Sequence, residues 1–179
     1  MMHSPLRSLL ADRRGTAIIE LALVAPVLAL TVVGIVDMSN AFSRKLALEQ
    51  GAHRAIEKIM QTTEDNTVEG TLKAEAVCQV NGMKADSTCE TSPITASDVT
   101  VTWRLECINT AGVVVSVQTS IDPDAFDLLS CSASPNTKDM RYIQVKVVDK
   151  YTPMFPLRFS GLNGDGTYHL SATAGMRTQ

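Results

Sequence analysis

The stretch that decides the fold runs from Arg13 to Pro26 and reads RRGTAIIELALVAP. Two arginines and a glycine end a short basic leader, and an apolar segment begins at once. One carboxylate, Glu20, stands at the fifth position after Gly15, inside that apolar segment. An ionisable side chain in an apolar run of membrane length is costly, so its presence there indicates a function.

The apolar run is long enough to cross a membrane only if it includes Glu20. No charged residue occurs from Leu21 to Val36, a stretch that makes roughly 24 Å of helix at 1.5 Å per residue. A bilayer core is about 30 Å thick, and a helix that starts at Thr16 reaches about 31 Å. Pro26 would break a soluble helix, but membrane helices tolerate such prolines. We therefore predict a leader at residues 1–15 and a membrane helix at residues 16–38.

Charge is distributed unevenly along the chain, and the pattern predicts a topology. Residues 1–15 carry three arginines against one aspartate, whereas the part from Asp37 onward holds 13 of the 16 Lys and Arg and 17 of the 19 Asp and Glu. By the positive-inside rule, the N-terminus stays in the cytoplasm and the remainder is exported. The formal net charge of -3 gives no indication of a nucleic-acid partner.

A second helical stretch, residues 39–61, continues the membrane segment. Its apolar side chains recur at helical spacing and form one face: Leu48, Ala52, Ala55, Ile56 and Ile59. Such a face packs against a globular domain. Gly51 counts against the helix by about 1 kcal/mol relative to alanine. We predict one long helix with a membrane half and an amphipathic half.

The remaining residues, 62–179, are predicted to form an exported α+β domain. Leu72, Ala76 and Val80 share one face of a short helix over Glu69–Val80. Asn81-Gly82 is typical of a helix stop. Val99–Cys107 then alternates apolar and polar side chains with a period of two, which predicts a strand with one buried face.

Three further segments are predicted to be strands: Val113–Gln118, Tyr142–Val148 and Tyr168–Met176. Ala111-Gly112 predicts a hairpin before the first of them. Ile121–Ala133 is a loop or a short helical turn, and the prolines in Tyr151–Phe159 indicate an edge segment or a buried loop. The predicted fold class is α+β, with the long helix packed on a small antiparallel sheet.

All four cysteines, Cys78, Cys89, Cys107 and Cys131, follow the apolar run. An even number on the exported side predicts two disulfides. Three connectivities are possible, and we favour Cys78–Cys89 with Cys107–Cys131 because sequential pairs close the shortest loops. No C-x-x-C spacing and no adjacent histidine occur, so a zinc site is not expected.

The N-terminal motif resembles that of the TadE-like pseudopilins, from the tight-adherence (Flp) branch of type IV pilus systems. From Arg14 to Leu28 the chain has an Arg-Gly pair, small and aliphatic residues, a glutamate and an apolar run with proline, as this family does. The resemblance extends from Arg13 to Arg54. It implies a minor pilin that takes part in assembly of a Tad (Flp) pilus used for surface adhesion.

The resemblance also implies roles for single residues. A membrane prepilin peptidase would cut between Gly15 and Thr16, and a backbone without a side chain at Gly15 enters a protease cleft readily. Arg13 and Arg14 would hold the leader at the cytoplasmic face. Glu20 would oppose the positive end of the mature helix and pair with the α-amino group of Thr16 on a neighbouring subunit.

The implied partners are the prepilin peptidase, the inner-membrane assembly platform, other pilins or pseudopilins, and the membrane itself. The implied location is the bacterial inner membrane, crossed once, with the C-terminal domain in the periplasm or, within a pilus, outside the cell. The role is non-enzymatic, and no catalytic residue, cofactor or metal is expected. His53, His169 and the turn-like Asn163–Gly166 are interpreted as structural.

Two other classes of function stay open on the sequence. One is a single-pass membrane-anchored envelope binding domain or adhesin that has no filament role. The other is a secreted protein with a cleavable signal peptide, which includes a secreted enzyme of unknown chemistry. In that case the small residues of Ser39-Asn40-Ala41 would form the cleavage site.

Overall fold

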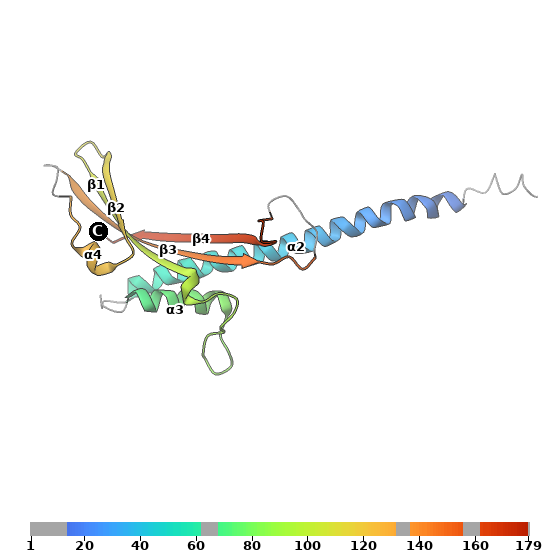
Figure 1. Cartoon of the computed structure of the whole chain (residues 1–179), viewed down its shortest axis with the longest axis horizontal. Helices are drawn as coiled ribbons and strands as arrows, with labels where there is room; N and C mark the ends of the chain where they lie inside the picture. Colours follow the sequence, from blue (N-terminus) through green and yellow to red (C-terminus); the bar gives the residue numbers. More distant parts are fainter. Residues whose placement is uncertain (1–13, 62–67, 132–136, 156–161, 179) are drawn as a thin grey trace, which may run out of the picture.

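The computed structural model describes residues 14–61, 68–131, 137–155 and 162–178 of the chain. A single helix, α2 (Arg14–Gln61), runs for 48 residues, or about 72 Å at 1.5 Å per residue. Its first half projects away from the rest of the molecule, and its second half lies against the sheet (Figure 1). Pro26 lies inside this helix without ending it. The predicted long N-terminal helix is confirmed.

Four antiparallel strands form the sheet: β1 (Val99–Ile108), β2 (Val114–Ser120), β3 (Lys138–Tyr151) and β4 (Tyr168–Arg177). Their order across the sheet is β2-β1-β3-β4. β1 and β2 form the predicted hairpin, and Gly112 in its turn has a φ of 79°, which favours glycine. The predicted α+β fold class is confirmed.

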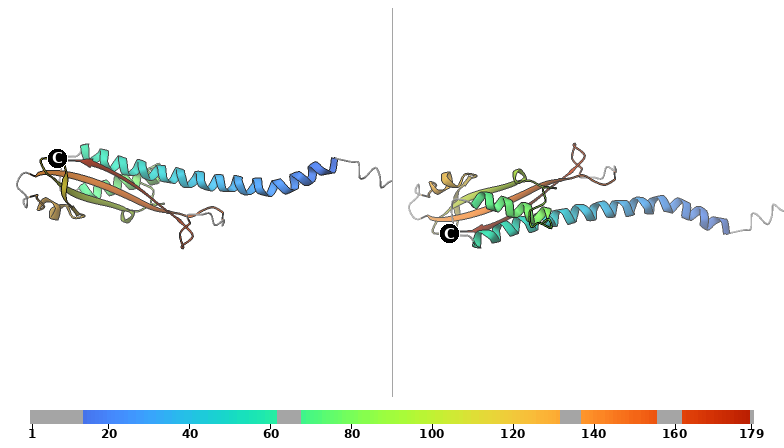
Figure 2. Two further views of the ribbon diagram at one scale, coloured as in Figure 1. Left: turned by 90° about the horizontal axis from the view of Figure 1, so that it is seen from above. Right: turned by 90° about the horizontal axis from the view of Figure 1, so that it is seen from below.

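The shorter helices are α3 (Val68–Asn81), the 3₁₀ turn η2 (Ala96–Asp98) and α4 (Pro123–Asp127). α3 lies alongside the end of α2, and both helices cover the same face of the sheet (Figure 2). For Ile121–Ala133 the sequence allowed either a loop or a short helical turn, and α4 is such a helical turn within that segment. The Asp122 carboxylate caps it by accepting the N–H of Asp124 at 3.0 Å.

The hydrophobic core lies between the two helices and the inner face of the sheet. The alternating residues of β1 all point into it, and Trp103 on that face is 6% exposed. The predicted apolar face of α2 is also there, with Leu48, Ala52 and Ala55 fully buried. Facing residues complete the core: Leu72 and Ala76 of α3, Val145 and Val147 of β3, and Ala172 and Ala174 of β4.

β3 runs from Lys138 to Tyr151, so it is longer than the predicted strand, Tyr142–Val148. It lies between β1 and β4, so both of its edges form backbone hydrogen bonds: Lys138 pairs with Ile108, and Tyr151 pairs with Tyr168. Backbone pairing needs no apolar side chain. The hydrophobic pattern therefore marked only the buried centre of this strand.

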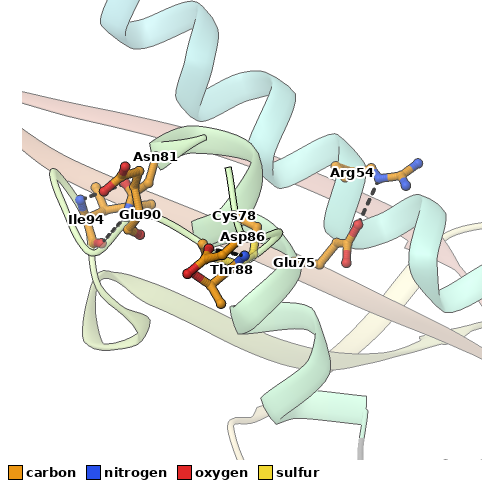
Figure 3. Close-up of a disulfide and its surroundings, with 9 residues drawn as sticks. Arg54, Glu75, Cys78, Asn81, Asp86, Thr88, Glu90 and Ile94 are labelled. Atoms are coloured by element: carbon orange, nitrogen blue, oxygen red, sulfur yellow. Dashed lines mark hydrogen bonds and ion pairs between the residues drawn. A yellow bond between two sulfur atoms is a disulfide. The ribbon is translucent and has the colours of Figure 1, made fainter. Parts of the chain in front are cut away.

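Both disulfides join the cysteines in the favoured sequential pairs. Cys78–Cys89 ties the last turn of α3 to the following loop, with a Cα–Cα distance of 4.9 Å (Figure 3). Cys107–Cys131 ties the end of β1 to the segment after α4, at 5.5 Å. Asn81 fixes the first loop further, because its amide group bonds the backbone of Glu90 and Ile94.

Gly51 lies where α2 packs closely against α3. A Cβ atom at this position would come within 2.5 Å of the Val80 Cγ2 atom and 3.0 Å of the Ala76 carbonyl oxygen. The glycine that weakens the helix in isolation thus permits the two helices to approach. Gly70 in α3 is different, since a Cβ atom there would meet nothing within 4 Å.

The same substitution is therefore expected to have opposite effects at the two glycines. Gly51→Ala should lower the free energy of unfolding by about 1 kcal/mol, because overpacking costs about 1–3 kcal/mol and exceeds the gain in helix propensity. Gly70→Ala should raise it by about 0.5–1 kcal/mol. Denaturant unfolding of the detergent-solubilised proteins measures both changes. A stabilised Gly51→Ala form would contradict this account of the helix contact.

Candidate functional site

From Ile18 to Val36, α2 is apolar on every side apart from the Glu20 carboxylate. The side chains from Ile18 to Val36 pack against no core, and examples such as Ile18, Leu23 and Ile35 are 71%, 70% and 68% exposed. By length and composition, one helix in the described part of the chain is able to cross a membrane, and this is that helix. The Thr31 hydroxyl donates to the Leu28 carbonyl at 2.8 Å, so its polar group is satisfied without water.

The residues of the predicted cleavage site lie at the start of α2. Arg14, Gly15 and Thr16 are its first three residues, whereas Arg13 lies outside the described residues. The sequence predicted a helix from Thr16, and in the structure the helix begins two residues earlier, at Arg14. Gly15 has helical backbone there, and the first turn of a helix frays readily because its N–H groups have no intrahelical partner.

Glu20 lies one turn after Thr16 and is exposed in the apolar half of α2. Within the residues that the structure describes, no hydrogen bond or ion pair reaches its carboxylate. A carboxylate without a partner is costly in hydrocarbon. The side chain is therefore placed where a cation from outside this molecule has access to it.

A polar junction fastens α2 to the end of β3, immediately after the apolar half. Among the described residues, Asp37 is a charged residue that is buried, with 4% of its surface exposed. Its two carboxylate oxygens accept separate backbone N–H groups, from Met154 at 2.9 Å and from Phe155 at 3.3 Å. One side chain thus fixes the segment that follows β3 to the helix.

Two more side chains on the same side of α2 extend this junction. Asn40 donates its amide N–H to the Met154 sulfur at 3.3 Å, and Arg44 pairs with Asp149 of β3 at 2.8 Å. The Asp149 side chain is 9% exposed, so this ion pair is largely shielded from water. Burial raises the pKa of the nearby Tyr151 phenol, and the Asp37 charge acts in the same direction.

Sequence reasoning missed this junction. It treated Asp37 only as the end of the uncharged run, and the partners of Asp37 and Arg44 lie 105 or more residues further along the chain. In the structure Arg54 pairs with Glu75 of α3 at 2.9 Å (Figure 3). The sequence feature that pointed to the junction was a charged residue, Asp37, directly after the apolar run.

Removal of the Asp37 carboxylate is expected to loosen the junction. Asp37→Ala leaves two backbone N–H groups without acceptors, at a cost of about 2–3 kcal/mol. The amides of Met154 and Phe155 should then exchange hydrogen about 30-fold faster or more. Asp37→Asn keeps one acceptor oxygen and should have about half the energetic effect. Hydrogen exchange of the full-length protein in detergent measures both.

Asp139 provides a matched control, because it is an exposed carboxylate on the same strand, β3. Asp139→Ala should leave exchange at Met154 and Phe155 unchanged. Equal exchange in the Asp37→Ala and Asp139→Ala forms would show that the Asp37 contacts do not hold the segment.

A separate group of polar side chains lies at the turn before β4. His169 bonds Asp165 at 2.8 Å, and Thr167 bonds the same carboxylate, so the pKa of Asp165 lies well below its usual range. Both contacts close the turn before β4. Among the described residues, no three His, Cys, Asp or Glu side chains are arranged to hold a metal ion. His53 is exposed on α2.

These features define a protein with one N-terminal helix that fits a single-pass membrane anchor, joined to an α+β domain. Residues 15–56 match the family model described as TadE-like protein. The resemblance drawn from the N-terminal motif is thus confirmed over that segment, which includes Gly15, Glu20 and Asp37. Neither the curated proteins nor the solved structures contain a match to the chain.

Proposed function

We propose that this chain is a TadE-like pseudopilin that acts as a minor pilin in assembly of a Tad (Flp) pilus for surface adhesion. The observation that carries the proposal is Glu20, an exposed carboxylate on an apolar helix, five residues after Gly15 and inside the family-matched segment. Its role is structural and non-enzymatic. A TadE-like segment supports association with the Tad pilus in general.

In this proposal the leader is removed between Gly15 and Thr16 by a prepilin peptidase at the cytoplasmic face. Arg13 and Arg14 keep the leader on that side, and the domain faces the periplasm. The new α-amino group of Thr16 on one subunit then pairs with Glu20 of another subunit. Such a pair sets the axial register and removes the cost of an isolated carboxylate in hydrocarbon. The assembly platform and other pilins are the remaining partners.

The junction at Asp37 argues against release as a secreted protein. Cleavage after Ala41 would remove Asp37 and Asn40, which bind Met154 and Phe155. Ala41 is itself 8% exposed and lies inside an unbroken helix. A secreted form would therefore lose contacts that the folded domain uses, which supports retention of the whole helix.

The test is the N-terminus of the membrane-fraction protein, measured by intact mass with and without a co-expressed prepilin peptidase. A peptidase-dependent start at Thr16 is the expected result. A start at Ala41 or Phe42 would identify a secreted protein. An intact Met1 or Met2 in the presence of the peptidase would identify a plain membrane anchor, with an envelope binding domain as its function.

A further inference from the structure

The end of β3 and the start of β4 lie at the level where the apolar half of α2 ends. Val36 is the last residue of that half, and Asp37 follows it directly. Because Asp37 accepts the N–H groups of Met154 and Phe155, these two residues are fixed within one helical turn of the end of the span. Their depth relative to a membrane follows from this contact.

Two side chains at this level, those of the residues bound by Asp37, are apolar and exposed. Met154 is 67% exposed and Phe155 is 37% exposed, although neither is needed to fill the core. Their backbone N–H groups already have the Asp37 carboxylate as acceptor. The tip of the sheet, where β3 ends and β4 starts, therefore presents these apolar side chains toward the membrane, and their N–H groups need no water as acceptor.

Tyr168 carries this surface onto the helix. It is the first residue of β4, and with Val27, Leu30, Gly34 and Ile35 it lines an apolar groove beside α2. Those four helix residues belong to the membrane span itself. An aromatic side chain with a polar hydroxyl at the end of a span is typical of the membrane–water interface.

The arrangement fits a flat lipid surface better than a single neighbouring helix. Figure 2 shows the ends of β3 and β4 beside α2 and angled away from its axis. A bilayer perpendicular to α2 contacts the helix and these strand ends at the same level. The groove is also continuous with the apolar half of the helix, which lipid surrounds in the proposed anchored state.

We infer that Met154, Phe155 and Tyr168 form an interfacial foot that enters the outer boundary of the bilayer beside the span. The foot sets the tilt of the domain on the membrane before the subunit joins any assembly. Asp37 is the positioning residue, since it fixes the foot to the helix. The inference rests on the membrane anchorage in the proposed function and is independent of processing at Gly15.

The test uses the full-length chain in phosphatidylcholine liposomes, with and without lipids brominated near the headgroup. Phe155→Trp and Met154→Trp place a fluorophore in the foot, and the native Trp103 is buried in the core and gives a constant background. Leu128→Trp is the matched control, since Leu128 is 86% exposed next to α4 at the far end of the domain (Figure 1). Val24→Trp lies near the middle of the span, and its quenching by lipids brominated near the end of the acyl chain reports insertion of the span.

Quenching of the Phe155→Trp and Met154→Trp emission by the brominated lipids, with no quenching of Leu128→Trp or the parent protein, is the expected result. The quenching should persist as lipid is added in excess over protein. If Val24→Trp is quenched and both foot variants are not, the proposal of an interfacial foot is contradicted, while the membrane anchor is supported. Burial of the foot residues by a second copy of the chain would give this same result and would equally contradict the proposal. If Val24→Trp is also not quenched, the anchorage fails, and the foot fails with it.

Discussion

A Gly15→Leu form of the chain is expected to keep its leader when the prepilin peptidase is present. Gly15 is helical in the uncut chain, and a peptidase cleft must take the scissile bond in a more extended form. Leucine disfavours that step twice, because it raises helix propensity by up to about 1 kcal/mol and adds a side chain next to the bond that is cut. A displacement of about 1 Å at a reacting bond costs on the order of 100-fold in rate.

Intact mass of the membrane-fraction protein measures this effect directly. Gly15→Ala, which adds one methyl group, should slow processing less. Ala29→Leu adds comparable bulk on the exposed apolar half of the same helix, and it should be cut like the parent protein. Normal processing of the Gly15→Leu form would remove the pseudopilin interpretation.

Replacement of Glu20 is expected to separate processing from assembly. Glu20→Ala makes the helix more apolar, so insertion into the membrane should not suffer. The loss should appear only between subunits, where the Thr16 α-amino group is left without its partner. Removal of one member of a buried ion pair costs about 3–5 kcal/mol. Such a cost corresponds to a loss of incorporation of more than 100-fold.

Two measurements on the same cells test this prediction: the N-terminal mass and the amount of sheared pili. Glu20→Gln keeps the size of the side chain without its charge, and it should fail in the same way. Glu49→Ala is the control, because Glu49 is a half-exposed carboxylate on α2 outside the span, paired with Lys45 at 4.0 Å. Unchanged piliation in the Glu20→Ala strain would count against a role of this carboxylate in register.

Local patterns in the sequence were sufficient for most of the fold. The 3.6-residue spacing of Leu48, Ala52 and Ala55 predicted a buried helix face, and these side chains are fully buried. The period-two pattern of Val99–Cys107 predicted a strand, and Trp103 lies on its inner face. Both predictions succeeded because burial of one face imposes the period of the secondary structure on the sequence.

Patterns failed where polar contacts connect distant parts of the chain. Arg44 and Asp149 are 105 residues apart, and no local spacing relates them. Gly51 was counted against its helix, since the close approach of α3 that requires a glycine is not visible in one segment alone. The outer parts of β3 were missed for the same reason, because their stability comes from neighbouring strands.

The sequence by itself determined that a basic segment precedes an apolar stretch that carries one carboxylate, because charge and hydropathy are properties of consecutive residues. It also determined that all four cysteines follow this apolar stretch. Only the tertiary structure decided that Asp37 fastens the end of β3 to α2 at the end of its apolar half. That contact depends on the sheet bringing Met154 and Phe155 back to the helix, and strand order is set by packing of the whole chain.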